Sequence, residues 1–260
     1  MKKTLIALAV AASAVVSGSA MAAWTQNGAG GNLAIGGDLT PVAKVTPWEV
    51  EVGAAVATLN ADVQKGQANV DVLVKSSIPV LGIRSNNANG FKGAPAIDPQ
   101  INYGGKVDID TMRNGVATLT LDVNSGGAKI GALSVPLWIA AQAHNGTASS
   151  NVMLIAPTQG DGFFGGIAKT KEGVWNSASA TNWATTLFPG IADTWNDAGN
   201  AFTGGEPLSF NFTSTTNTYN AYYASGIDKS ETIKITLDQV VAADTPIQWT
   251  ASLPIAVTYE

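Results

Sequence analysis

The chain has 260 residues, with 14 lysines and arginines against 19 aspartates and glutamates, for a formal net charge of -5 at pH 7. An acidic chain lacks the basic surface that nucleic acid binding needs, so nucleic acid is excluded as a partner. The absence of cysteine and the presence of one histidine exclude disulfides and the usual zinc sites, and we expect no metal and no cofactor.

Residues 1–22 have the three parts of a secretory signal peptide. Met1-Lys2-Lys3 is basic, Thr4 to Val16 is an apolar run too short to span a bilayer, and Ala20-Met21-Ala22 fits the small-x-small cleavage rule. We therefore predict export and cleavage after Ala22, with cleavage after Ala23 as the alternative.

Residues 23–40 then form a free, glycine-rich N-terminus with an alternating pattern. Pro41 ends the pattern, and no turn dipeptide joins it to a following strand as a hairpin would require. One interpretation is an ordinary first strand paired within its own domain, and the other is a detachable terminal strand. In an extended chain one face would carry Ala29, Gly31, Leu33, Ile35, Gly37 and Leu39.

Most of residues 41–140 read as short strands with turn signals between them. Alternation of apolar and polar residues is typical of half-buried strands. Asn124-Ser125-Gly126-Gly127 predicts a hairpin turn between the last two. The expected strands are Trp48–Val52, Val70–Val74, Ile78–Ile83, Val107–Asp110, 117–123 and 130–140.

The pattern changes at about residues 141–205, which we interpret as a large insertion. A short helix is expected from a cap at Thr181 to Leu187, and a second from Pro189 to a closing Gly199. Aromatic residues lie here among polar residues and glycines. Such side chains often stack on sugars or anchor protein contacts, but a small core that holds the insertion in place is the alternative. The candidate receptor contacts are Trp175, Trp183 and Trp195.

Strands resume after the insertion, at 208–212, 219–224 and 233–237. The last expected strand is long, and its apolar face carries Trp249, Ala251, Leu253, Ile255, Val257 and Tyr259. Many short strands predict an all-β sandwich or barrel, and helices confined to one insertion favour the sandwich. Residues 41–260 are therefore expected to form one domain.

No motif indicates an enzyme. Gly160-Asp161-Gly162-Phe163-Phe164-Gly165 matches a dinucleotide motif by letter, but no helix pattern follows it and no acidic residue lies at the required spacing. His144 is the only histidine, and no G-x-S-x-G elbow occurs. We interpret these residues as loop residues.

Three segments resemble FaeG-type major fimbrial subunits, which build surface fimbriae of enterotoxigenic Escherichia coli and its relatives. They are the leader Met1 to Val10, the segment Ile35-Gly36-Gly37-Asp38-Leu39-Thr40, and the ending Gln248 to Tyr259. The match is strong at both ends and weak in residues 85–230.

The resemblance implies a chaperone–usher pilin: an incomplete immunoglobulin-like sandwich that lacks its last strand. A periplasmic chaperone would fill the open position, and after export through an outer-membrane usher the N-terminal strand of the next identical subunit would replace it. The resemblance assigns the donor role to the face Ala29 to Leu39. It assigns the acceptor and chaperone edge to Trp249, Leu253, Ile255, Val257 and Tyr259.

The resemblance also implies a place in a cell-surface fimbrium and allows adhesion to host glycans through the insertion. One alternative is a minor subunit of the same system. A different class, an outer-membrane β-barrel protein, is disfavoured by polar residues on the second face of many strands and by the terminal Glu260.

Overall fold

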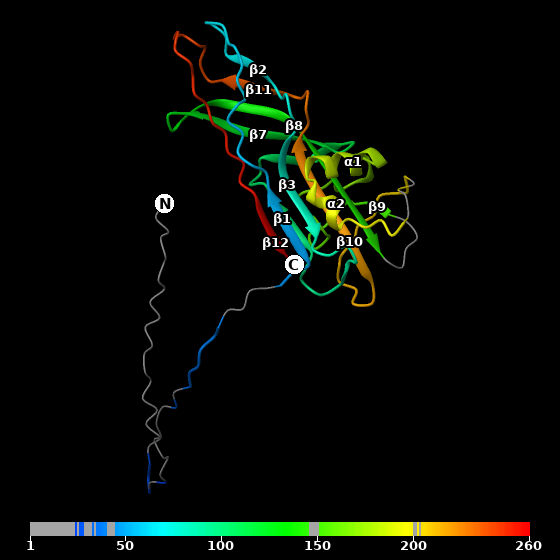
Figure 1. Cartoon of the computed structure of the whole chain (residues 1–260). Helices are drawn as coiled ribbons and strands as arrows, with labels where there is room; N and C mark the ends of the chain where they lie inside the picture. The colour runs from blue at the N-terminus through cyan, green and yellow to red at the C-terminus, as the bar shows by residue number, and fades with distance from the viewer. Residues whose placement is uncertain are drawn as a thin grey trace, which may run out of the picture. The chain divides into compact units, whose positions relative to one another are not determined.

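The computed structural model describes residues 24, 26–28, 33, 35–40, 45–145, 151–199, 202 and 204–260 (Figure 1). The chain divides into two compact units, Met1–Lys44 and Val45–Glu260. The described residues of the first unit form no helix or strand and are exposed. They therefore do not form an ordinary first strand, whereas Ala29 and Gly31 lie outside the described residues.

The second unit is mostly antiparallel β-structure. Within the described residues, one ten-stranded sheet has the central order β1-β3-β10-β8-β11-β2, with β4 on β10, β6 on β7, and β7 and β9 on β8. β5 and β12 form a second sheet. The strands are β1 (Trp48–Val52), β2 (Asn69–Leu73), β3 (Ile78–Ser85), β4 (Phe91–Lys92), β5 (Pro99–Asn102), β6 (Val107–Arg113), β7 (Val116–Ser125), β8 (Ala128–Asn145), β9 (Asn151–Met153), β10 (Thr218–Ile227), β11 (Thr232–Leu237) and β12 (Ala256–Tyr259).

The long strand β8 organises the sheet. Its first half lies between β7 and β11, and its second half between β9 and β10. The predicted hairpin that joins β7 to β8 is confirmed. Its turn contains Gly126 and Gly127, whose φ angles of 58° and 85° are in the left-handed region that favours glycine.

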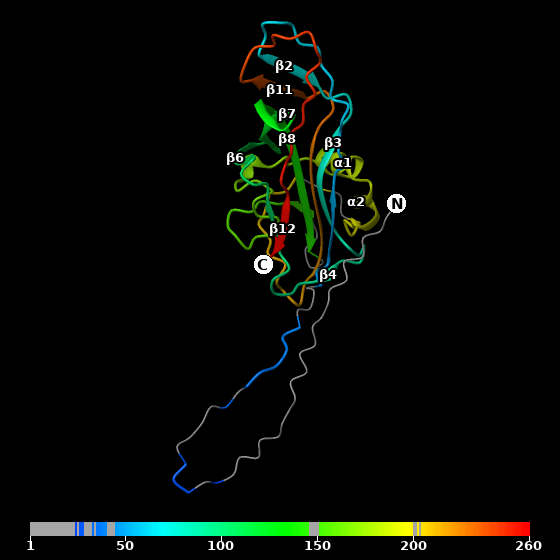
Figure 2. The same cartoon turned by 90° about the vertical axis from the view of Figure 1, so that its left-hand side faces the viewer.

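The insertion covers part of the sheet with η1 (Lys171–Gly173), α1 (Ala178–Leu187) and α2 (Gly190–Thr194) (Figures 1 and 2). α1 contacts β8 and β10, and α2 contacts β3. In β8, burial alternates through the first half, but every residue from 139 to 144 is buried. The second half of β8 therefore has packed neighbours on both faces.

Glycine permits the close approach of the insertion to the sheet. A Cβ atom at Gly82 of β3 would lie 2.9 Å from a ring carbon of Phe188, which is buried after α1. At Gly226 of β10 it would lie 2.6 Å from Leu187. Larger residues at these two positions would push the end of α1 away from the sheet.

One hydrophobic core includes residues of both sheets and of the insertion. Phe163 and Phe212, neither measurably exposed, pack edge-on against Trp48 of β1. The hydroxyl groups of Tyr103 and Tyr223 share a buried hydrogen bond of 2.6 Å. Phe163 belongs to the glycine-rich loop 160–165. This loop therefore contributes a side chain to the hydrophobic core and does not form the N-terminus of a helix.

Several sequence predictions are wrong in detail. Ser177, not Thr181, caps α1: its Oγ accepts the Ser179 N–H at 3.3 Å, while the Thr181 hydroxyl donates to Gln142 Oε1 at 3.0 Å. The expected strand 208–212 is reduced to one bridge at Leu208. The expected strand 249–259 has a ladder only over β12, and β8 extends to Asn145, inside the expected insertion.

Candidate functional site

The first candidate feature is an open edge that starts at β1. Among the described residues β1 pairs only with β3, and beyond it Gly53 N–H donates to Val80 O at 3.1 Å. Between there and Gly66, the only backbone–backbone hydrogen bonds among the described residues are local ones: Asn60 N–H donates to Thr58 O, and Gln64 O accepts from Gln67 N–H. This edge therefore presents unpaired backbone groups over a long extended segment.

Apolar side chains along this edge are exposed, although they lie on the same side of the strand as the buried Trp48. Trp48 is 7% exposed, whereas Val50 and Val52, which point to the same side in alternation, are 42% and 58% exposed. Val56 is 44% exposed. Alternation alone predicts that these valines share a face with Trp48, but it does not predict that the core stops short of them.

The second feature is the C-terminal segment. Within the part of the chain that the structure describes, β12 pairs only with β5, and Thr250 exchanges backbone hydrogen bonds of 2.8 and 2.9 Å with Asn124. Residues 242–249 and 251–255 make no other backbone–backbone hydrogen bond with any described residue. This segment is a second open edge.

Hydrogen bonds hold the two edges together at both ends. At one end Gly66 N–H donates to Val241 O at 2.8 Å, and Val241 N–H donates to Gln67 O at 2.9 Å. At the other end the Trp48 indole donates to Ile97 O at 2.7 Å, and the next residue, Asp98, exchanges backbone bonds of 3.0 and 3.1 Å with Glu260. Figures 1 and 2 both draw the two segments running between these ends.

The predicted acceptor residues share one side of the second edge. Between residues 249 and 260 burial alternates strictly between half-buried and exposed. The half-buried residues pack against the core, so the predicted orientation agrees with the structure even where no ladder forms. We call the five predicted acceptor residues together with Ala251 the acceptor face: Trp249, Ala251, Leu253, Ile255, Val257 and Tyr259.

The predicted donor residues are found almost entirely in solvent. Leu33, Ile35 and Leu39 are 84%, 89% and 97% exposed, and Gly37 is exposed as well. Trp24, near the predicted cleavage site, is fully exposed. The apolar side chains of this series are therefore exposed in the single chain.

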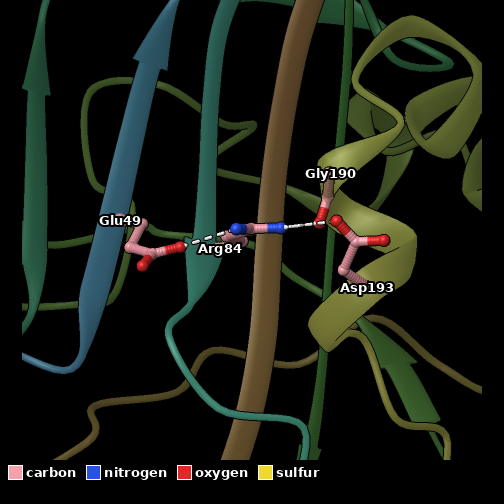
Figure 3. A network of polar contacts seen from close by, with 4 residues as sticks. All are labelled: Glu49, Arg84, Gly190 and Asp193. Atoms are coloured by element: carbon pink, nitrogen blue, oxygen red, sulfur yellow. Dashed lines mark hydrogen bonds and ion pairs between the residues drawn. The ribbon is translucent and has the colours of Figure 1, made fainter.

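An arginine that sequence analysis missed ties the first open edge to the insertion (Figure 3). Arg84 of β3 is half-buried between Glu49 of β1 and α2. Its Nε and Nη2 atoms each lie 2.8 Å from a Glu49 carboxylate oxygen, and Nη1 donates to Gly190 O and lies 3.3 Å from Asp193 Oδ2. One side chain thus links β1, β3 and α2.

The structure brings two of the three candidate receptor residues together. Trp175 lies between Trp138 of β8 and Trp183 of α1, with ring centroids 5.0 and 5.9 Å apart. Trp195 packs instead against Tyr222 of β10, at 4.9 Å. All three candidates are half-buried, so much of their surface attaches the insertion to the sheet.

Carboxylates accept hydrogen bonds from two of these indole groups. Trp183 donates to Asp228 Oδ1 at 3.2 Å, and Trp138 donates to Glu231 Oε1 at 2.8 Å. Glu231 also borders a surface hollow of about 390 Å³, which β7, β8 and β11 line with Thr118, Ser134, Thr232 and Lys234. Hydroxyl and charged groups therefore surround this hollow.

The described part of the chain contains neither a metal site nor a helix that could span a membrane. Within it, no three histidine, cysteine, aspartate or glutamate side chains come together as a metal site. Among the same residues, no helix has both the length and the apolar character needed to cross a membrane.

Comparison with known proteins identifies relatives over the full length. Residues 1–260 match the family model described as "Fimbrial, major and minor subunit". The chain is 30% identical to K88 fimbrial protein AC and to F41 fimbrial protein, both from Escherichia coli, with 100% of each chain covered. It is 29% identical to K88 fimbrial protein AD from the same organism, again with 100% of both chains covered.

Proposed function

Because the chain belongs to the family of K88- and F41-type major and minor fimbrial subunits, we propose that it polymerises by donor-strand exchange. As a family member it is a structural subunit of cell-surface fimbriae and not an enzyme. In the proposed mechanism, residues 45–260 are an incomplete immunoglobulin-like sandwich. The N-terminal segment 23–40 of a neighbouring subunit adds the missing strand.

The observation that carries the proposal is the pair of open edges. A strand placed between them would accept and donate backbone hydrogen bonds on both sides, which would satisfy groups that are otherwise left to water. It would also cover Val50, Val52 and Val56 on one side and Ile247, now 40% exposed, on the other. Each of these side chains is exposed on a segment that already borders the gap.

The lengths of the two faces support the same pairing. The donor face from Ala29 to Leu39 has six alternate positions, as has the acceptor face from Trp249 to Tyr259. At about 3.4 Å per residue, each spans about 34 Å. Burying Leu33, Ile35 and Leu39 would contribute about 1.5–3 kcal/mol each.

A subunit with two open edges is an aggregation hazard before it assembles. We therefore propose that a periplasmic chaperone occupies the gap first, and that an outer-membrane usher is the place where the next subunit replaces it. If so, Ile255→Asp on the acceptor face should reduce co-purification with the chaperone. Thr258→Asp, on the exposed side of β12, should leave it unchanged.

The direct test is polymer formation by Ile35→Asp. A charge on the donor face should abolish fimbriae on electron micrographs of cells that express the complete fimbrial system. Ala34→Asp is the matched control, because position 34 alternates with the donor face and should tolerate the charge. Wild-type amounts of fimbriae with Ile35→Asp would exclude the mechanism. Antibody labelling along the shaft or only at rare points would distinguish a major from a minor subunit.

Adhesion to host glycans is a second role that we propose for the same subunit. It is supported by the half-buried tryptophans of the insertion and by the hydroxyl-lined hollow beside Glu231. The simultaneous substitutions Trp175→Ala, Trp183→Ala and Trp195→Ala should abolish binding to a glycan array. Fimbriae that form normally and keep their glycan binding would contradict this role without affecting the polymerisation mechanism.

A further inference from the structure

The link that closes one end of the gap contains a buried acid. Asp98 precedes β5 and is 1% exposed. Its backbone exchanges hydrogen bonds with Glu260 after β12, and the preceding carbonyl, that of Ile97, accepts the Trp48 indole N–H of β1. Residues 97–98 therefore join the first open edge to the second.

The surroundings of the Asp98 carboxylate favour its neutral form. Oδ1 accepts the backbone N–H of Phe212 at 2.7 Å, but no cation pairs with Asp98 in the described part of the chain. The other acidic groups nearby are Asp161, which is itself buried, and the terminal Glu260, whose side chain accepts from Gln159 at 2.6 Å. The segments that pack here from β1 and from residues 209–214 contain no lysine or arginine.

Asp161 is well satisfied as a carboxylate. It accepts from the backbone N–H and the hydroxyl of Thr158, both at 2.9 Å, and from the Ser209 hydroxyl at 3.1 Å. Among the described residues, the only other residue that donates to the Asp98 carboxylate is Phe212, through its backbone amide. Asp98 is therefore the less well satisfied of the two carboxylates.

We propose that Asp98 is a proton-binding switch in the link between the two open edges, and that acidification below neutral pH tightens this link. Burial, partly offset by the Phe212 hydrogen bond and reinforced by the negative charge of Asp161, raises the pKa of Asp98 to about 6. Because this pKa lies above the unfolded value of 3.8, the stabilisation is complete below about pH 3.8 and is lost as the pH rises through about 6. The stabilisation therefore changes most between the unfolded pKa of 3.8 and the native pKa of about 6, and this change is opposite in sign to the usual effect of an ion-paired carboxylate.

The test is denaturant unfolding of the purified chain at pH 7.5 and pH 5.0, for the wild type and for Asp98→Asn. Linkage predicts that protonation of Asp98 alone lowers the unfolding equilibrium constant of the wild type about tenfold between these two pH values. Asp98→Asn should lose this tenfold change. Asp62→Asn, in the exposed segment after β1, should keep it. The same pH dependence in wild type and Asp98→Asn would overturn the proposal.

A second measurement does not depend on the folding of the variant. The Phe212 amide donates to Asp98, so its proton chemical shift in the wild-type chain should titrate with a midpoint near pH 6. A midpoint below pH 5 would overturn the proposal.

The consequence for assembly rests on the proposed function, whereas the response of the single chain does not. Wild-type fimbriae should release subunits on heating less readily at pH 5.0 than at pH 7.5, and Asp98→Asn fimbriae should lose that difference. If the pH dependence were found for unfolding of the single chain but not for release of subunits from fimbriae, only the role of Asp98 in assembly would be contradicted. Loss of polymer with Ile35→Asp tests donor-strand exchange independently of Asp98.

Discussion

The two ends of the chain have the same alternating apolar pattern and differ sharply in exposure. Leu33, Ile35 and Leu39 are 84–97% exposed. The acceptor face from Trp249 to Tyr259 is half-buried throughout. Alternation therefore tells which side chains can share a face, but burial depends on whether a partner is present in the same molecule.

The C-terminal end is itself an intermediate case. Only Ala256–Tyr259 has a ladder, with β5, and the residues before it keep strand-like alternation with little backbone pairing. Its inward-facing side chains are half-buried. If the missing partner is the N-terminal segment of a neighbour, supplying it should remove the difference between the two ends.

The largest effect is expected when residues 24–40 are joined to the C-terminus through a flexible linker. The added segment should fill the gap in its own chain and raise the free energy of unfolding by about 5 kcal/mol. Three buried side chains contribute about 1.5–3 kcal/mol each, and new backbone hydrogen bonds offset most of the lost chain entropy. Denaturant unfolding measures the change.

The matched control for this experiment is the same fusion with Leu33→Ser, Ile35→Ser and Leu39→Ser. It keeps the linker and the backbone but removes the apolar anchors, so its stability should be close to that of the natural chain. Equal stabilisation by both fusions would mean that the pattern of residues 33–39 has no role in filling the gap.

A smaller and more specific effect is expected for Val52→Asp. Val52 is 58% exposed, so the substitution should change the stability of the isolated chain by less than about 0.5 kcal/mol. In the complemented chain Val52 would be covered, and burying a charge there should cost at least about 2 kcal/mol. The difference between the stability costs of Val52→Asp in the isolated and in the complemented chain tests whether the donor strand covers Val52.

Glu51→Asp is the control for this comparison, because Glu51 points to the other side of β1 and is exposed. It should be neutral with and without the donor segment. An equal cost of Val52→Asp in both forms would show that the valine edge is not where the strand docks.

Period-two patterns were enough to predict most of the strands from the sequence. β1, β2, β3, β7, β8, β10 and β11 all lie where alternation or an apolar run placed them. The strand predicted at 208–212 is wrong, although the apolar residues Leu208, Phe210 and Phe212 alternate with polar ones. Phe212 is fully buried in an aromatic cluster, while Leu208 makes a single bridge, so the pattern there reflects side-chain packing without a ladder.

The candidate site was only partly predictable, for a related reason. The acceptor face follows from alternation, which is local. The exposure of Val50, the link at Asp98 and the position of Arg84 depend on residues far apart in sequence, such as Glu260 paired with Asp98. The predicted cap of α1 is also wrong: serine and threonine are both caps by residue type, and in the structure Ser177 caps the helix while the Thr181 hydroxyl donates to Gln142.

The smallest effect is expected for Arg84→Ala, which tests whether the first open edge is held by the insertion. The substitution removes the contacts to Glu49, to Gly190 O and to Asp193, most of them at the surface (Figure 3). Surface ion pairs contribute about 0.2–1 kcal/mol and a neutral hydrogen bond about 1 kcal/mol, so a loss of about 1–2 kcal/mol is expected. Glu49→Gln should cost less, because it leaves the bonds between Arg84 and α2 in place.

If the Arg84 bridge positions β1 for the donor strand, Arg84→Ala should also reduce the stability gained from the fused segment, and hydrogen exchange of the β1 amides should quicken. An unchanged gain would mean that β1 is positioned by its pairing with β3 alone, and that the insertion and the assembly edge act independently.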